Sequence, residues 1–577
     1  MRRLFPYLSS YKKECVLAPL FKMLEAIFEL FVPLVMARII DIGITNADKA
    51  EIARMCGLLL LLAAVGLASS LTAQFFAAKA ATGFSARLRH ALFEHIGTLS
   101  FSRLDTIGTS TLITRMTSDI NQAQAGVNMT LRLFLRSPFI VFGAMVMAFQ
   151  VNAGEAMIFV VTIPVLALIV LGIMALTMPL YRKVQSALDA VLLTTSENLE
   201  GVRVLRAFRR EKAETLRFDA ENERLSGLQR FVGRLSGLMN PLTLVVVNAA
   251  TIVLLYTGAI QVDAAVITQG ELTALVNYMS QILVELVKLA NLIVTISKAL
   301  SSAGRVADIL EIRPDILDGT AGLPELPAEG APAVAFENVS LKYAESGEDA
   351  ISEVSFRADP GETIGIIGGT GSGKSTVVNL IPRFYDVTEG RILINGVDVK
   401  DCRQEDLRCL VGMVPQKALL FRGSIADNLR WGNKDASYEE MKEALIAAQA
   451  WDFVSRMPQG MESPLSEGGK NLSGGQRQRL TIARALVRRP RILILDDSAS
   501  ALDFATDARL RAAIRSMPED MTVFIVSQRA ASVMHADKIL VMENGRISGT
   551  GTHEELLKQN HIYREIYESQ FKTASGT

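Results

Sequence analysis

The sequence predicts an α-helical membrane domain followed by an α/β domain, and three features support this. Half of the 577 residues are hydrophobic, and the mean hydropathy is positive, which is unusual for a soluble chain. The apolar residues gather in the first half, in stretches of the roughly 20 residues that a bilayer core requires. From about residue 334 the pattern changes to short strands alternating with helices, as in an α/β domain. A chain of this length is also too long for one core.

The membrane prediction depends on six apolar stretches. They are residues 15–41, 55–80, 137–153, 157–179, 241–261 and 272–297. The third is the least clear, because it is short before Gln150. The N-terminal sequence MRRLFPYLSSYKKE has neither the short apolar core nor the small-residue cleavage site of a signal peptide. We therefore expect a short interfacial helix that leads into the first span.

The loops predict the orientation of the chain. Segments 81–136 and 180–235 are rich in arginine and lysine, whereas the opposite loops are short and lean acidic. An excess of lysine and arginine marks the cytoplasmic side. Both termini are therefore expected in the cytoplasm, in a multi-pass protein of a bacterial-type cell (inner or plasma) membrane. The two basic segments have helical patterns and should extend the membrane helices into the cytosol.

Charge and composition set further limits. The formal net charge is zero, so no basic field suggests a nucleic-acid partner. The four cysteines, Cys15, Cys56, Cys402 and Cys409, lack metal-ligand spacing and are too few for a disulfide framework. The stretch PDILDGTAGLPELPAEGAP, residues 314–332, is rich in Pro, Gly and acidic residues and is predicted to be a linker. The predicted domains are residues 1–311, a linker at 312–333, and residues 334–577.

The second domain carries a phosphate-binding motif in TIGIIGGTGSGKSTVVNLI, residues 363–381. An apolar strand enters a glycine-rich loop and a helix follows, which is the context that G-x-x-x-x-G-K-[ST] requires. Backbone N–H groups of such a loop cradle phosphates. Lys374 is expected to reach the β- and γ-phosphates, and Ser375 to bind Mg²⁺, so ATP and Mg²⁺ are the predicted cofactors. The predicted binding loop consists of Gly368, Gly369, Thr370, Gly371, Ser372, Gly373, Lys374, Ser375 and Thr376.

Two later stretches add to this site. In ILILDDSASALD, residues 492–503, a buried strand delivers Asp496. In LSGGQRQRLTIARAL, residues 472–486, Ser473, Gly474 and Gly475 open a helix and form a second anion cradle. Alone, this Ser-Gly-Gly could simply start a helix. Beside the aspartate-ended strand, it suggests that two domains close on shared nucleotide.

With these motifs the chain resembles a half-transporter of the ATP-binding cassette superfamily, of the six-helix exporter type, over essentially its whole length. The resemblance implies a type IV exporter fold with helices swapped between two subunits, an α/β P-loop nucleotide-binding domain, and a lipid bilayer around the first domain. It implies that Tyr343 stacks on adenine and that Gln416 and Asp496, with Ser375, serve Mg²⁺, Asp496 through water. The residues it assigns to the partner's ATP are Ser473, Gly474, Gly475, Gln476 and Asp503.

The resemblance also marks contacts between domains. Glu467 is expected where the cassette meets the long helices. The segments RLDTIGTSTLITRMTSDI and ENLEGVRVLRAFRRE resemble coupling helices, so each loop should press on a cassette.

Two positions depart from the family's pattern. The general base is a glutamate in the family but Asp497 here, and the switch histidine is replaced by Gln528; His535, seven residues later, is a poor substitute. A base must come within about 2.6–3.2 Å of its proton, and the shorter aspartate retreats by about 1.5 Å. A misplacement near 1 Å can lower a rate about a hundredfold. We therefore expect a site that binds MgATP and hydrolyses it poorly.

This pattern resembles the degenerate-site subunit of a heterodimeric exporter, whose different partner half-transporter supplies the missing groups. A slow homodimer and a non-transporting ATP sensor are the alternatives. The expected substrates are small hydrophobic or amphipathic compounds (drugs, lipids or peptides), and the transport direction stays open. In the first span Lys22, Glu25 and Glu29 share one helical face, so Glu25 and Glu29 are candidates for the substrate path. Glu285 and Lys288 should form a structural pair.

Overall fold

The computed structural model describes residues 4–343, 347–517 and 520–571. This part of the chain divides into two compact units: Met1–Gly97 with Gly108–Ile312, and Thr98–Ile107 with Arg313–Thr577. The division differs from the predicted boundary, because the short helix α4 (Phe101–Ile107) belongs to the second unit although its neighbours in sequence belong to the first. Residues 1–3 of the predicted interfacial helix lie outside the described residues.

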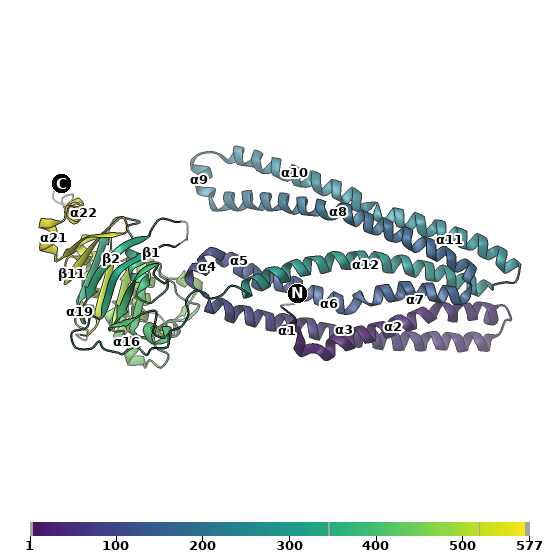
Figure 1. Cartoon of the computed structure of the whole chain (residues 1–577), viewed down its shortest axis with the longest axis horizontal. Coiled ribbons are helices and arrows are strands. Elements are labelled where there is room, and N and C mark those ends of the chain that lie inside the picture. The colour runs from purple at the N-terminus through teal and green to yellow at the C-terminus, as the bar shows by residue number, and fades with distance from the viewer. Residues whose placement is uncertain (1–3, 344–346, 518–519, 572–577) are drawn as a thin grey trace. The chain divides into compact units, whose positions relative to one another are not determined.

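The described part of the first unit consists of helices joined by short turns (Figure 1). After α1 (Phe5–Leu8), the helices are α2 (Lys12–Arg38), α3 (Lys49–Thr98), α5 (Thr109–Thr114), α6 (Ile120–Met129), α7 (Arg136–Val151), α8 (Ala153–Glu200), α9 (Val202–Ala207), α10 (Glu211–Gly237), α11 (Met239–Asp263) and α12 (Gln269–Leu310). Short π-helical turns such as Arg115–Asp119 join the pieces between α5 and α7. Each predicted apolar stretch therefore falls largely or wholly within a helix.

Within the described residues, five helices are long and apolar enough to cross a membrane: Lys49–Thr98, Thr109–Val151, Ala153–Glu200, Glu211–Asp263 and Gln269–Leu310. The first predicted span corresponds to α2, which is not among these five and which carries three charged residues, Lys22, Glu25 and Glu29, near its middle. At 1.5 Å per residue, the 50-residue α3 is about 75 Å long, far more than the roughly 30 Å of a bilayer core. Helices of this length continue well beyond the membrane.

The helices pack into bundles. Helix α12 packs against α2, α6 and α7, and α8 runs beside α10 and α11 (Figure 1). Tyr278 of α12 is fully buried in this core, and its hydroxyl donates a hydrogen bond to the carbonyl oxygen of Leu30 at 2.6 Å. That bond joins α12 to α2 and satisfies a phenol that burial would otherwise leave unpaired.

The second unit contains sheets and surrounding helices. In its described residues, the larger sheet has the order β12-β11-β3-β10-β9-β6 and the smaller has the order β2-β1-β4-β5. The larger sheet consists of β12 (Arg546–Gly551), β11 (Lys538–Glu543), β3 (Thr363–Gly368), β10 (Thr522–Ser527), β9 (Ile492–Asp496) and β6 (Val411–Val414). The antiparallel smaller sheet consists of β2 (Ile351–Ala358), β1 (Val334–Leu341), β4 (Glu389–Ile394) and β5 (Val397–Asp398). A short ladder pairs β7 (Gly423–Ser424) with β8 (Pro464–Leu465).

Helices enclose these sheets. They are α13 (Lys374–Leu380), α14 (Gln404–Leu410), α15 (Ile425–Arg430), α16 (Tyr438–Ala447), α17 (Trp451–Val454), α18 (Gly474–Leu486), α19 (Phe504–Arg515), α20 (Ala530–Val533), α21 (His553–Gln559) and α22 (His561–Phe571). Strands β3, β10 and β9 are parallel neighbours and buried almost throughout. Their carboxyl ends therefore meet at one edge, where open α/β sheets bind ligands.

Candidate nucleotide site and membrane charge network

A cavity of about 340 Å³ lies at the carboxyl ends of β3, β9 and β10. Its wall contains predicted groups from distant parts of the chain. The lining residues are Tyr343, Ala350, Thr370, Gly371, Ser372, Gly373, Lys374, Ser375, Thr376, Gln416, Asp496, Asp497, Val526, Ser527 and Gln528. Sequence reasoning missed Ala350, Val526 and Ser527, which contribute wall without a chemical motif.

The glycine-rich loop has the backbone that phosphate binding requires. Gly371 and Gly373 have φ values of 78° and 94°, in the region that favours glycine. Gly368 ends β3 and lies outside the cavity wall; a Cβ there would come within 2.2 Å of the Met542 carbonyl oxygen. Gly369 also lies outside the wall, but its carbonyl oxygen accepts a hydrogen bond from Lys374 Nζ at 2.5 Å.

Lys374 is the first residue of α13, and its side chain contacts the backbone of this loop. Its Nζ also donates to the Gly368 carbonyl oxygen at 2.9 Å and to Ser372 Oγ at 3.2 Å. Burial lowers the pKa of the Lys374 ammonium, and the nearby carboxylates of Asp497 and Asp496 oppose that shift. The backbone carbonyls are weak partners for a cation, so phosphate oxygens would bind the ammonium more strongly.

The predicted magnesium ligands converge. Ser375 Oγ donates a hydrogen bond of 2.9 Å to Asp496 Oδ1, which joins the start of α13 to the end of β9. Burial raises the pKa of the Asp496 carboxyl, and the Ser375 hydrogen bond opposes the shift. Hydroxyl, amide and carboxylate oxygens suit Mg²⁺, which usually binds one or two carboxylates together with substrate phosphates. Ser375, Gln416 and Asp496 fit this role.

Among the described residues, no cluster of three or more His, Cys, Asp and Glu side chains could hold a metal ion.

The two departing positions also face the cavity. Asp497 Oδ2 accepts a hydrogen bond from Gln416 Nε2 at 3.4 Å, and Gln528, which follows the neighbouring parallel strand β10, also lines the cavity. Asp497 has a left-handed backbone with a φ of 44°, which aspartate tolerates better than most residues. His535 lies outside the cavity wall; its carbonyl oxygen accepts a hydrogen bond from Arg515, and burial lowers the pKa of its imidazole.

Tyr343 forms the rim of the cavity where adenine is expected. Its side chain is 45% exposed, and its hydroxyl donates to Thr376 Oγ1 at 3.1 Å. Behind it stands Tyr385, whose ring meets that of Tyr343 edge-on at 5.0 Å between centroids. No sequence pattern points to Tyr385 beyond its place shortly after α13.

The second anion cradle lies elsewhere on this unit. Ser473 caps α18 by accepting from the Gln476 backbone N–H at 3.3 Å, and Gln476 Oε1 accepts from the Ser473 N–H at 2.9 Å. Asp503 caps α19 by accepting from the Thr506 N–H at 2.9 Å, and this hydrogen bond lowers the pKa of its carboxyl. Ser473, Gly474, Gly475, Gln476 and Asp503 are absent from the cavity wall, which lies within the described residues. Glu467 opens a short 3-10 turn at Glu467–Gly469.

The two segments that resemble coupling helices have different surroundings. The first segment, residues 103–120, begins in α4, which belongs to the compact unit of the nucleotide site, and continues through α5 in the helical unit. In α4, Phe101 contacts Phe384 at 4.7 Å between ring centroids and Asp105 accepts a hydrogen bond from Tyr385. The second segment forms α9 and its flanks in the helical unit. It exposes Phe208 by 74% and Val204 by 60%.

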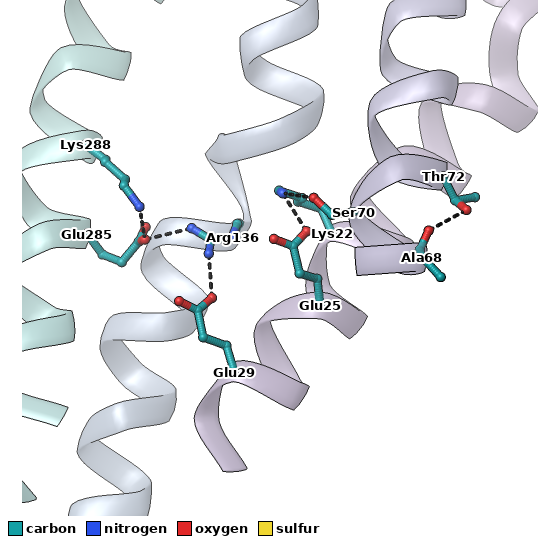
Figure 2. Close-up of polar contacts among 9 residues, drawn as sticks. All are labelled: Lys22, Glu25, Glu29, Ala68, Ser70, Thr72, Arg136, Glu285 and Lys288. Carbon is teal, nitrogen blue, oxygen red and sulfur yellow. Dashed lines mark hydrogen bonds and ion pairs between the residues drawn. The ribbon is translucent and has the colours of Figure 1, made fainter. Parts of the chain in front are cut away.

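Charged side chains in the membrane helices form two separate groups of contacts, shown in Figure 2, one around Lys22 and a larger charge network around Arg136. Lys22 Nζ binds Glu25 Oε2 at 2.5 Å and donates to Ser70 Oγ at 3.1 Å. Arg136, which is 7% exposed, binds Glu29 at 2.6 Å and Glu285 at 2.7 Å. These contacts connect α2, α3, α7 and α12.

Glu285 is the buried centre of this network. Besides Arg136, it accepts hydrogen bonds from Ser137 Oγ and Lys288 Nζ, each at 2.8 Å. The expected contact between Glu285 and Lys288 is present, but it is part of a larger set. Arg136 was counted among the basic residues of a cytoplasmic loop; in the structure it opens α7 and is buried. Glu29 is 41% exposed and Glu25 17% exposed.

The fold and the site define a membrane protein with a P-loop nucleotide-binding domain. Comparison with known proteins extends this. Residues 15–286 match the family model for the ABC transporter transmembrane region, and residues 351–500 match the family model described as ABC transporter. The chain is 36% identical over 575 residues to the ABC transporter ATP-binding protein YfiB of Bacillus subtilis, with 99% of each chain covered.

Other relatives are similar over nearly their full length. An ABC transporter ATP-binding protein of Mycobacterium tuberculosis is 35% identical over 573 residues, covering 99% of this chain and 98% of that one. The ATP-dependent lipid A-core flippase of Yersinia pestis is 29% identical, covering 99% and 97%. The solved structure of a bacterial Atm1-family ABC exporter with ATP bound matches with a TM-score of 0.78 and 25% identity, covering 97% and 98%.

The chain belongs to the ABC transporter family. It is a half-transporter with an α-helical transmembrane domain and an α/β nucleotide-binding domain, homologous to exporters of this family. It is a multi-pass membrane protein whose nucleotide-binding domain is cytoplasmic, as in bacterial inner-membrane exporters. ATP hydrolysis coupled to transport is the activity of the family, and its exporters work as dimers.

Proposed function

We propose that this chain is the ATP-holding half of a heterodimeric exporter for hydrophobic or amphipathic compounds. Its own site binds MgATP and hydrolyses it slowly. Its Ser473–Gln476 segment and Asp503 complete the site of a second, different half-transporter, which provides a glutamate base and a switch histidine.

The arrangement of the cavity supports this proposal. Lys374, Ser375, Asp496 and Gln416 line the cavity together, which supports the roles proposed for them toward phosphate and magnesium. Asp497 occupies the position of the base but is one methylene short of a glutamate, which withdraws its carboxylate by about 1.5 Å. Gln528 can donate a hydrogen bond to a γ-phosphate but cannot supply the positive charge of a protonated histidine. Binding is therefore favoured over cleavage.

Within this chain, each group has a distinct task. Lys374 and the loop N–H groups hold the phosphates, Tyr343 stacks against adenine, and Ser375, Gln416 and Asp496 hold Mg²⁺, which supplies charge neutralisation to the phosphates when bound. Asp497 positions water too far from the γ-phosphate for efficient attack.

The membrane half is suited to amphipathic cargo. Glu29 is the most exposed carboxylate in the charge network, and Glu25 is held by Lys22. We assign Glu25 and Glu29 to the path of small amphipathic compounds, with Glu29 the more accessible. Val204 of α9 and Phe208, which directly follows α9, are exposed and would dock on the partner's nucleotide-binding domain.

The test is to purify the tagged chain from its native membrane and identify what copurifies with it by mass spectrometry. We expect a second half-transporter at equal stoichiometry that carries glutamate and histidine at the positions of Asp497 and Gln528. Rapid Mg²⁺-dependent hydrolysis by this chain alone would contradict the proposal and favour a homodimer. Transport by the reconstituted pair, measured as ATP-dependent flux of a fluorescent amphipath into vesicles, separates a transporter from an ATP sensor.

A further inference from the structure

The C-terminal helix α22 is hydrogen-bonded to the loop that carries Gln528. The side-chain amide of Gln570 accepts a hydrogen bond from the Ala530 N–H at 2.8 Å and donates one to the Gln528 carbonyl oxygen at 2.8 Å. These partners fix the orientation of the amide, because a flipped amide would set oxygen against oxygen and N–H against N–H. A residue near the chain end therefore holds the backbone on both sides of Arg529.

Helix α22 is well placed to hold that loop steadily. Tyr563 is fully buried, and its hydroxyl lies 2.7 Å from His553 Nδ1. In the same apolar cluster are Ile367, which precedes the glycine-rich loop, and Ala530 and Val533 of α20. The helix thus rests on the strand that supplies the phosphate loop and on the helix that follows Gln528.

The loop in turn reaches the segment after Asp497. Arg529 Nη1 and Nη2 donate to the carbonyl oxygens of Ala499 and Ser500 at 3.5 and 3.4 Å. A shift of the loop would therefore move the Gln528 side chain relative to the cavity.

We propose that α22 positions the loop that carries Gln528 through Gln570, so that the Gln528 side chain is held at the nucleotide cavity. Gln570 acts through Gln528 and is a positioning residue. The inference depends on the γ-phosphate contact proposed above for Gln528, and the test separates the two.

The experiment uses the full-length chain in lipid nanodiscs with Gln570→Ala, Gln570→Glu and Gln528→Ala. The control is Glu565→Gln, which alters an exposed residue of the same helix that pairs with His561. Hydrogen exchange of the Ala530 amide is followed by mass spectrometry, and release of radiolabelled ATP is measured with Mg²⁺. Loss of one hydrogen bond corresponds to about tenfold less amide protection. Gln570→Glu keeps the acceptor for Ala530 but sets a carboxylate against the Gln528 carbonyl oxygen, so its Ala530 protection should fall less.

We expect Gln570→Ala to lower Ala530 protection about tenfold and to speed ATP release about as much as Gln528→Ala does. The double variant should release ATP no faster than Gln528→Ala alone, because both changes act through one contact. A general loss of stability would instead add to the effect.

Unchanged Ala530 protection in Gln570→Ala would overturn the inference, as would faster ATP release in the double variant than in Gln528→Ala. Normal ATP release in Gln570→Ala beside fast release in Gln528→Ala would also overturn it. Normal release in Gln528→Ala would instead refute the proposed role of Gln528, and with it the functional part of the inference.

Discussion

The hydroxyl of Tyr385 donates a hydrogen bond of 3.1 Å to Asp105 Oδ2 on α4. Burial and the Asp105 carboxylate raise the pKa of the Tyr385 phenol, so it remains a donor at neutral pH. The same ring packs edge-on against Tyr343, whose hydroxyl reaches Thr376 at the start of α13. The adenine end of the nucleotide site is thereby connected to α4, which belongs to the same compact unit although its neighbours in sequence belong to the helical unit.

Removing that hydroxyl should weaken the coupling between transport and hydrolysis. In Tyr385→Phe the ring still supports Tyr343, so we expect ATP binding to stay within about twofold of wild type. The hydrogen bond to a charged group is lost, and substrate stimulation of ATPase in the two-chain assembly should fall about fivefold to tenfold. Steady-state ATPase with and without an amphipathic substrate measures this.

The control for this change is Tyr438→Phe, which removes the hydroxyl of a tyrosine that is 56% exposed on α16. Equal losses of stimulation in the two variants would show that the Asp105 contact has no special part in coupling. Asp105→Asn should reproduce Tyr385→Phe, because an amide oxygen accepts the hydrogen bond more weakly than a carboxylate.

Restoring the missing groups should raise hydrolysis at this chain's own site. In Asp497→Glu with Gln528→His, the carboxylate advances by about 1.5 Å and a cationic side chain becomes available. We expect single-turnover cleavage to rise about a hundredfold, with ATP affinity little changed. The matched control is Asp452→Glu, at an aspartate that is 63% exposed and pairs with Arg479. An unchanged cleavage rate would mean that these side chains do not limit the chemistry.

Sequence reasoning worked best where a local pattern has one physical cause. The bilayer thickness dictates the length of apolar helices, so the apolar stretches fell within helices. The glycine-rich loop was recognisable because its backbone requires glycine at Gly371 and Gly373. Both signals can be read from neighbouring residues.

Contacts between elements far apart in the sequence could not be predicted from local patterns. Arg136 looked like one more cytoplasmic charge, because counting basic residues treats every arginine as solvated. Its partner Glu285 lies 149 positions away in the sequence, and no local pattern around Arg136 indicates this contact. Gln570 is similar, since a glutamine on a polar helix has no pattern that points to the Gln528 loop.

The charge network should be sensitive at Glu285 and tolerant at Glu29. Glu285→Gln leaves Arg136 and Lys288 beside a neutral group in a site where the glutamate is 3% exposed. Breaking a buried pair of this kind costs about 3–5 kcal/mol. Glu29→Gln affects a carboxylate that is 41% exposed and should cost less than about 1 kcal/mol. Thermal unfolding of the two full-length variants in detergent measures these costs. Equal melting temperatures for Glu285→Gln and Glu29→Gln would show that Glu285 is not the buried centre of the network. Arg136→Met with Glu285→Leu should recover much of the loss.

A charge placed in the second anion cradle should affect the partner's chemistry and spare this chain's own site. A Cβ at Gly474 would meet no atom within 4 Å, so Gly474→Asp can be accommodated without disturbing α18. Its carboxylate would repel the phosphates that this cradle is proposed to receive from the other subunit. We expect at least about a tenfold loss of ATPase in the two-chain assembly, from a like-charge penalty of a few kcal/mol, while ATP still binds this chain's own cavity. Gly322→Asp, equally open in the linker, is the control. Unimpaired ATPase in Gly474→Asp would show that the cradle serves no nucleotide.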